Sequence, residues 1–322
     1  MKPLTVIATA DIHGRFTDRL PAVKNYVDRT RQEGPVILLD AGDFFTGTVE
    51  ADYANFGESG QGHRGAQQAV DLGYDAMVPG NHDEELPEGI KSRISEVLKN
   101  ILVTEGIKII DRGGFRTGIV CIPLQSNIEL LKSKSDRLLR EVGNCDFKIG
   151  LIHHGPADCV GLEGYDAIFC GHEHKKTGIF RKVNCLIINP GPRANGIARV
   201  TLPSRGAKIV KLRHSSVSYT AEIERYGATV LTSNPPQRVD ALIAEALRKA
   251  FPKSTQTLTD EDDTPVSGSV TLTNSYRLLP YDDYPILIDG YIATTHYYIE
   301  RHMPGAKILA TAPLPLRHYI SE

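Results

Sequence analysis

The chain has 322 residues, of which 41% are hydrophobic and 24% are charged, as is usual for a globular protein and unlike a disordered one. Its 37 lysines and arginines are balanced by 39 aspartates and glutamates, and this net charge of −2 does not favour a nucleic-acid-binding protein, although a local basic patch remains compatible with it. Five cysteines at scattered positions argue against a disulfide framework and favour reduced, buried thiols.

The length predicts two domains, or one large domain with an appendage. No uninterrupted apolar run approaches the ~20 residues of a membrane span. The N-terminal residues run directly into a polar cluster, without the longer apolar core and cleavage site of a signal peptide. We therefore expect a cytoplasmic protein with no membrane partner. Nothing in the sequence indicates an oligomeric state.

Short apolar runs alternate with helical patterns over the first 170 residues. The sequence predicts strands at 4–10, 35–41, 75–79, 147–152 and 166–170, helices at 17–32, 66–72, 89–100 and 128–142, and a long loop at 47–65. This alternation of strand and helix predicts an α/β domain with a central sheet.

From residue 178 onward the pattern changes to consecutive strands, at 180–182, 185–188, 198–201 and 209–212, which we interpret as a meander. The first domain is therefore expected to comprise residues 1–214. Residues 215–322 are expected to form a smaller α+β region that contains a helix at 236–251, with apolar residues at helical spacing, and a polar loop at 252–268.

Five short polar clusters lie at or just beyond the ends of the apolar runs. They are Asp11-Ile12-His13, Gly42-Asp43, Gly80-Asn81-His82-Asp83, His153-His154 and Gly171-His172-Glu173-His174. In an open α/β sheet, ligands bind beyond the carboxyl ends of the strands, so these distant residues are expected to meet at one rim. Carboxylate oxygens and imidazole nitrogens suit Mn, Fe, Zn, Ni or Co, and a pair of such ions can generate hydroxide and hold a phosphate in line with it.

Each cluster taken alone has an ordinary explanation. An isolated Asp-x-His is most often a turn or a helix cap, and Gly-Asp is a common turn dipeptide. The joint occurrence of all five, in order and at strand ends, favours a site for two divalent metal ions.

This series resembles the pattern D-x-H, GD, GNH[D/E], H and GH-x-H of the calcineurin-like metallophosphoesterase superfamily, over residues 4–214. The resemblance implies a central β-sandwich flanked by helices and a dinuclear metal centre. It implies that the first metal is held by Asp11, His13, Asp43 and His174, and the second by Asp43, Asn81, His153 and His172, with Asp43 bridging. We prefer His153 to His154 because it comes directly off the apolar run.

The resemblance also implies a role for His82 in contacting the phosphate or in protonating the leaving oxygen, with Asn81 close to the substrate. Either Asp83 or Glu85 could orient His82, because Glu85 stands where related sequences have an aspartate. Arg193 follows a strand near the same rim, where it either contacts phosphate or is an ordinary solvated arginine.

Residues 11–16 and 69–83 resemble the 5′-nucleotidase and 2′,3′-cyclic-nucleotide phosphodiesterase branch of the superfamily, and residues 273–284 resemble a segment of its substrate-binding domain. Residues 215–322 are short for that domain, and they would then form a reduced substrate-binding or capping region. Tyr281, Tyr284 and Tyr291 are candidates for stacking on a base, although packing within strands is the favoured interpretation.

The predicted function is metal-dependent hydrolysis of a small phosphate ester, with a nucleotide as the expected substrate. The alternatives are a metal-dependent nuclease and a non-catalytic metal-binding scaffold. A nuclease would need a basic groove that the balanced charge does not indicate, so nucleic acid is not an expected partner. A scaffold has no need of a proton donor such as His82.

Overall fold

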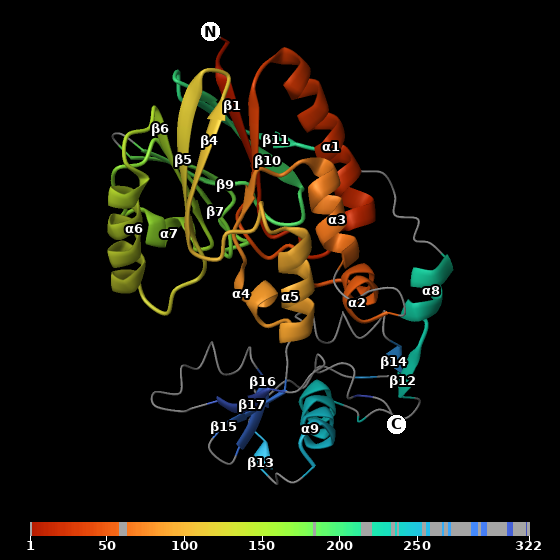
Figure 1. The fold of residues 1–322 in the computed structure, drawn as a ribbon. Coiled ribbons are helices and arrows are strands. Elements are labelled where there is room, and N and C mark those ends of the chain that lie inside the picture. The colour runs from red at the N-terminus through yellow and green to blue at the C-terminus, as the bar shows by residue number, and fades with distance from the viewer. Residues whose placement is uncertain are drawn as a thin grey trace. The chain divides into compact units, whose positions relative to one another are not determined.

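The computed structural model describes residues 2–57, 63–182, 185–213, 221–232, 236, 238–252, 256–257, 266, 270–271, 285–288, 291–294, 308–311 and 320. The chain divides into two compact units (Figure 1). The first comprises Met1–Thr46, Ala54–Glu84 and Gly89–Ser218, and the second comprises Gly47–Tyr53, Glu85–Glu88 and Tyr219–Glu322. Among the described residues, no helix has both the length and the apolar character needed to cross a membrane.

The first unit is built on two mixed sheets. One is five-stranded, in the order β11-β10-β1-β2-β3, and the other is six-stranded, in the order β4-β5-β6-β7-β9-β8. The five-stranded sheet consists of β1 (Leu4–Thr9), β2 (Val36–Asp40), β3 (Ala76–Met77), β10 (Gly196–Leu202) and β11 (Gly206–Lys211). The six-stranded sheet consists of β4 (Gly106–Arg112), β5 (Phe115–Ile122), β6 (Phe147–Ile152), β7 (Ala167–Cys170), β8 (Gly178–Lys182) and β9 (Cys185–Asn189).

The main hydrophobic core lies between these two sheets. Val6 and Leu39 of the five-stranded sheet belong to the same fully buried cluster as Ile149 and Phe169 of the six-stranded sheet. β1, β2, β6 and β7 read as almost unbroken apolar runs because these strands are buried on both faces. The two sheets therefore form a sandwich, as the sequence predicted.

Helices cover the outer faces of the sandwich (Figure 1). α1 (Phe16–Glu33) and α3 (His63–Leu72) lie against the five-stranded sheet, and α6 (Ile128–Val142) and α7 (Pro156–Cys159) against the six-stranded sheet. α6 begins where the Asn127 side chain accepts a hydrogen bond from the Leu130 amide at 2.8 Å, and its buried residues recur at helical spacing. The short α4 (Asn81–Glu84) and α5 (Glu88–Val97) follow β3.

The structure corrects two predictions about secondary structure and adds a hairpin. Residues 47–65 are not one long loop, because α2 (Val49–Phe56) forms within them. The hairpin of β4 and β5 was missed by the sequence analysis. The four strands after residue 178 are not one meander: β8 and β9 pair in the six-stranded sheet, whereas β10 and β11 pair in the five-stranded sheet. Local periodicity identifies strands but does not assign their partners.

The second unit has its own core and small sheets. Its elements are α8 (Ala221–Gly227), β12 (Val230–Thr232), α9 (Val239–Ala250), β13 (Gln256–Thr257), β14 (Val270–Thr271), β15 (Pro285–Ile288), β16 (Tyr291–Thr294) and β17 (Ile308–Thr311). Val239, Leu242 and Leu247 of α9 are buried in a cluster that also takes in Val49 and Ile223. The segment 273–284, with Tyr281 and Tyr284, lies outside the described residues, as does most of the predicted loop at 252–268.

Candidate metal centre

The predicted site residues follow the carboxyl ends of strands from both sheets. Because the two sheets pack face to face, loops from each reach a common rim of the sandwich. The five-stranded sheet supplies Asp11 and His13 after β1, Asp43 after β2 and Asn81 after β3, and the six-stranded sheet supplies His153 after β6 and His172 and His174 after β7.

Two groups of possible metal ligands occur among the described residues. The Asp11 cluster consists of Asp11, His13 and His174, whose ligand atoms all lie within 4.8 Å of one another. Nε2 of His13 is 3.0 Å from Nε2 of His174, which in turn is 3.6 Å from Oδ1 of Asp11. Asp11 is fully buried, and its Oδ2 atom has no hydrogen-bond partner. A buried carboxylate oxygen without a donor fits a cation at this position.

The Asp43 cluster consists of Asp43, His153 and His172, also with ligand atoms within 4.8 Å of one another. Asn81 joins it through its side-chain oxygen, which lies 3.2 Å from Nε2 of His153 and 3.0 Å from Nδ1 of His172. One amide oxygen therefore faces two imidazole nitrogens. Oxygen and neutral imidazole ligands of this kind suit first-row transition metals.

Asp43 links the two clusters. Its Oδ2 atom lies 3.3 Å from Nε2 of His153 and 3.9 Å from Nε2 of His13 in the Asp11 cluster. The other carboxylate oxygen, Oδ1, accepts a hydrogen bond from the His82 amide at 3.0 Å. A carboxylate with one oxygen facing both clusters has the position that a bridging ligand requires.

A backbone carbonyl fixes the ring of His153. Its Nδ1 atom lies 2.6 Å from the Ala41 oxygen, so Nδ1 carries the proton in this contact and Nε2 is left to act as a ligand. Sequence reasoning missed this partner, because a backbone oxygen carries no residue signature. His154, the alternative ligand, belongs to neither cluster: its Nε2 accepts a hydrogen bond from the Gln125 amide at 2.7 Å.

Several site residues have backbone conformations that are unfavourable for side chains other than glycine. The φ angles are +51° at Asp11, +49° at His13, +56° at Asp43 and +67° at His172. Non-glycine residues rarely adopt positive φ, and such strain collects at functional sites. Backbone hydrogen bonds between the loops, from Asp11 to Gly42 at 2.8 Å and from His13 to Asp43 at 2.9 Å, hold these conformations.

Two glycines allow the loops to approach closely. A Cβ atom on Gly80 would collide with the carboxylate and the amide of Asp43, and a Cβ atom on Gly42 would lie 2.5 Å from Nδ1 of His153. Gly42 also has a φ of +99°, which favours glycine at this position. The glycines that precede Asp43 and Asn81 in the sequence are therefore required by space as well as by the turn.

The electrostatics of the clusters set the protonation of the ligand atoms in the metal-free chain. Burial lowers the pKa of His13 to about 4 and, together with the charge of His153, that of His172 to about 4, so both rings are neutral. Burial acts to raise the pKa of Asp43, but the charge of His153 and other histidines outweighs it and holds the pKa well below its usual range. Burial acts to lower the pKa of His153, but the charge of Asp43 and the contact with its carboxylate outweigh burial and raise this pKa to about 9. The neutral rings of His13 and His172 and the ionised Asp43 are therefore ready for metal ligation, whereas His153 must release a proton when a metal binds.

His82 lies beside the clusters without belonging to either. It is buried, and its ring centroid is 5.7 Å from that of His13. Both oxygens of Asp83 accept hydrogen bonds from backbone amides, those of Phe44, Phe45 and Gly80, at 2.9 to 3.1 Å. Asp83 therefore fastens the loop after β2 to the loop after β3, a structural role that the sequence analysis did not foresee.

The two remaining predicted site residues, Glu85 and Arg193, belong to neither ligand cluster. Glu85 falls in the second compact unit, whereas His82 falls in the first. The Arg193 amide donates a 2.7 Å hydrogen bond to the Asp11 carbonyl, and its backbone is strained at a φ of +59°, but its side chain is exposed. The backbone of Arg193 thus supports the Asp11 loop.

Comparison with known proteins identifies the class to which this fold and these clusters belong. The model of the calcineurin-like phosphoesterase family matches residues 4–176. The chain belongs to this family, which places it among the phosphoric ester hydrolases and agrees with the resemblance seen in the motifs.

More particular relatives match only part of the chain. A 5′-nucleotidase of Vibrio vulnificus is 36% identical over 95 residues, which cover 26% of this chain and 16% of the relative. Protein UshA of Escherichia coli is 37% identical over 95 residues, with the same coverage. The match thus spans about a sixth of the length of these curated relatives.

Solved structures share the fold over most of the chain at low sequence identity. A 5′-nucleotidase precursor of Thermus thermophilus superimposes with a TM-score of 0.62 at 13% identity, covering 99% of this chain and 95% of its own. The NAD nucleotidase of Haemophilus influenzae gives 0.58 at 14% identity, with 89% and 76% covered. The sulfate thiohydrolase SoxB of Thermus thermophilus gives 0.54 at 13% identity, with 89% and 76% covered. The fold alone therefore does not determine the substrate.

Proposed function

We propose that this protein hydrolyses the phosphate ester of a nucleotide or a similar small molecule with the help of two divalent metal ions. The observation that carries the proposal is the pair of ligand clusters with Asp43 between them. An isolated carboxylate and histidine pair has many structural uses. Two such clusters that share one carboxylate at a sandwich rim have the arrangement of a dinuclear hydrolytic site.

In the proposed assignment each metal has four protein ligands. Asp11, His13, Asp43 and His174 hold the first ion, and Asp43, Asn81, His153 and His172 hold the second. Three observations support this set: the close approach of the His13 and His174 nitrogens, the contact of His172 with the Asn81 oxygen, and the Oδ2 atom of Asp11, which has no hydrogen-bond partner. The ligands are oxygens and imidazoles without thiolate, and manganese is the metal we propose among Mn, Fe, Zn, Ni and Co.

When bound, such ions supply a hydroxide at neutral pH and neutralise negative charge on the phosphate. The protein's own residues then position the ester and manage its protons. We assign to His82 the contact with the phosphate and the transfer of a proton to the leaving oxygen, because it is buried beside His13 and outside both clusters. Asn81 orients the substrate from the loop between the clusters, and Arg193 is a further phosphate contact in this proposal.

A nucleotide is the substrate class that the comparisons favour. The curated relatives that match over 95 residues are described as 5′-nucleotidases or UshA, and residues 69–83 carry the stretch that resembles that branch. We propose that residues 215–322 form a reduced substrate-binding or capping region. Tyr291 lies in β16, in this part of the chain.

A cytoplasmic location is a further part of the proposal. All five cysteines are free thiols, and four of them are buried in the first unit. Free thiols suit a reducing compartment, where disulfides are rare. Fractionation of the native host cell, with detection of the protein in the cytosolic or the extracytoplasmic fraction, tests this assignment.

A hydrolysis panel tests the function directly. The full chain, loaded with Mn²⁺, is assayed against p-nitrophenyl phosphate, bis-p-nitrophenyl phosphate, 5′-mononucleotides, 2′,3′-cyclic nucleotides and single-stranded DNA. Asp43→Ala is the control, because removing the shared carboxylate should abolish any turnover that belongs to this site. We expect release of phosphate from a mononucleotide or opening of a cyclic nucleotide. Activity on DNA alone would show a nuclease, and no activity on any ester would favour the scaffold.

A further inference from the structure

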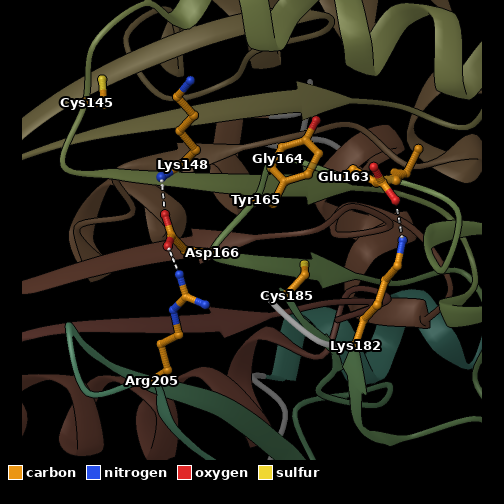
Figure 2. Close-up of a pocket in the computed structure, with 10 residues that line it drawn as sticks. Cys145, Lys148, Glu163, Gly164, Tyr165, Asp166, Lys182, Cys185 and Arg205 are labelled. Carbon is orange, nitrogen blue, oxygen red and sulfur yellow. Dashed lines mark hydrogen bonds and ion pairs between the residues drawn. The ribbon is translucent and has the colours of Figure 1, made fainter.

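A second pocket opens at the opposite end of the six-stranded sheet from the metal centre (Figure 2). Lys148 lies near the amino end of β6 and Asp166 immediately precedes β7, whereas His153 and His172 follow the carboxyl ends of these two parallel strands. At about 3.3 Å per residue, Lys148 and His153 are roughly 17 Å apart along the strand. The pocket and the metal clusters share no residue.

Asp166 organises one wall of this pocket. Its Oδ2 accepts a hydrogen bond from the Lys148 backbone amide at 2.8 Å, and its Oδ1 accepts one from Nη2 of Arg205 at 2.5 Å (Figure 2). Arg205 lies in the turn between β10 and β11, with a positive φ of +54°. Asp166 therefore holds the Arg205 guanidinium in a defined position at this strained turn. A ligand that binds here would cost Arg205 little further side-chain freedom.

Two further cations line the same pocket. The Lys148 side chain extends away from Asp166 in Figure 2, and none of the ion pairs in the described part of the chain involves its ammonium. The Lys182 ammonium lies 3.1 Å from Oε1 of Glu163, but the Glu163 side chain is 81% exposed. An exposed pair of this kind contributes little, so Lys182 can exchange Glu163 for a better acceptor.

The pocket therefore combines positively charged side chains with buried, largely apolar residues. Lys148, Lys182 and Arg205 outnumber the carboxylates of Glu163 and Asp166 by one charge. Leu162, Tyr165 and Cys185 are buried beneath them, and the Tyr165 hydroxyl is already paired with Ser135 at 2.8 Å. The cavity measures about 740 Å³, which is within the range of pockets that hold small organic ligands and larger than an inorganic anion needs.

We propose that this pocket, at the end of the six-stranded sheet remote from the metal centre, is a second binding site. It takes a small organic anion that bears a phosphate or carboxylate group. The anionic group contacts the Lys148 ammonium, and a second polar group of the ligand contacts Lys182 in place of Glu163. The carbon skeleton lies over Leu162 and Cys185. A divalent cation does not fit, because both carboxylates of the pocket already face a lysine or an arginine.

Calorimetric titration of the metal-chelated full chain tests the site, since chelation removes the proposed metal ions, which could also bind an anion. Glycerol 3-phosphate and citrate serve as the phosphate and carboxylate probes. Lys148→Gln removes one charge while its backbone hydrogen bond to Asp166 remains, and Kd should rise about tenfold, as expected for the loss of one charge-assisted contact. Lys99→Gln, at an exposed lysine elsewhere in the first unit, is the matched control and should leave Kd unchanged.

Glu163→Gln gives a test of opposite sign. Removing this carboxylate releases Lys182 and raises the net positive charge of the rim, so the probe that binds should bind more tightly. Circular dichroism confirms that each variant is folded before titration. The proposal is overturned if neither probe binds at millimolar concentration, if Lys148→Gln behaves like Lys99→Gln, or if Glu163→Gln weakens binding. These results are independent of whether the metal-loaded protein hydrolyses nucleotides.

Discussion

At the scale of single residues, the metal centre depends on the absence of a side chain at Gly80. A Cβ atom there would overlap the Asp43 carboxylate, which lies between the two ligand clusters. Gly89 provides a matched contrast, because a Cβ atom on it would meet nothing within 4 Å. The two glycines lie nine positions apart and differ in what surrounds them.

We therefore expect Gly80→Ala to displace Asp43 and lose metal, with activity falling in proportion. Gly89→Ala should retain its metal and its activity. It should stabilise α5 by about 0.5–1 kcal/mol, because alanine favours a helix more than glycine does. Metal content by plasma emission spectrometry and the thermal midpoint of each variant check these outcomes. Equal metal content in the two variants would contradict the role assigned to Asp43.

His82 allows a second prediction at this scale. Because it lies outside both clusters, His82→Ala should retain its metals while kcat falls by about 10²- to 10⁴-fold, the usual contribution of a general acid. Steady-state kinetics on the best substrate of the panel, together with metal analysis of the same sample, separates the two effects. Loss of metal in this variant would mean that His82 is a ligand rather than a proton donor.

At the scale of elements, the ends of neighbouring strands carry a buried carboxyl group that the proposed chemistry does not use. Asp40, the last residue of β2, lies opposite Thr9, the last residue of β1. The Thr9 hydroxyl donates to Oδ2 of Asp40 at 2.5 Å, and the Gly42 amide donates to Oδ1 at 3.0 Å. Burial outweighs these hydrogen bonds and raises the pKa of Asp40 from 3.8 to about 8.

This shift predicts how the stability of the metal-free protein depends on pH. Between pH about 4 and about 8 the folded chain retains the Asp40 proton, which the unfolded chain has already lost. The contribution of Asp40 to the free energy of unfolding should therefore fall as pH rises through this window. Asp40→Asn, which is neutral throughout, should lack this contribution, so that in urea titrations from pH 4 to 8 its stability relative to the wild-type protein rises with pH. Asp111→Asn, at a side chain that is 67% exposed, should follow the wild-type profile.

If the free energy of unfolding of Asp40→Asn depends on pH in the same way as that of the wild-type protein, the buried carboxyl does not contribute to this dependence.

Asp83 also acts at the scale of elements, beyond its neighbour His82. Its carboxylate joins the loops after β2 and β3, and these loops carry Asp43 and Asn81. A residue predicted to assist catalysis thus has a structural task that fixes the distance between two proposed ligands.

At the scale of the whole molecule, metal binding should be coupled to folding. The clusters gather the buried carboxylates of Asp11 and Asp43 with histidines from the loops of both sheets, so the unfolded chain does not offer the same site. A cation present at 100 times its Kd should stabilise the folded chain by about 2.7 kcal/mol. We expect the thermal midpoint to rise by several degrees between chelated and Mn²⁺-loaded protein, as measured by scanning calorimetry.

Asp43→Ala serves as the control for this coupling, because removing the shared ligand should abolish most of the rise. A thermal midpoint that is the same with chelator and with Mn²⁺ would contradict the existence of the metal centre. A shift of equal size in Asp43→Ala would show that the ion binds elsewhere in the chain.

The sequence alone indicated an α/β domain, and the resemblance of its motifs pointed to the family, to its sandwich and to the residues that meet at the rim. It could do so because strands and their polar ends are local features: His153 directly follows the apolar run of β6, and Asp11 and Asp43 follow two other runs. Local composition likewise identified α9 and α6. What these features have in common is that neighbours in the chain decide them.

The tertiary structure decided everything that depends on residues far apart in the chain. Packing between segments distant in sequence decides which sheet β8 and β10 enter. It also brings the Ala41 carbonyl to His153 and lets Asp83 hydrogen-bond to two loops. Lys148 and Arg205 line the same pocket although they are 57 positions apart in the sequence. The periodicity of the sequence does not predict such contacts, because they follow from how whole sheets stack. Only the folded chain places the two ends of β6 in different chemical environments.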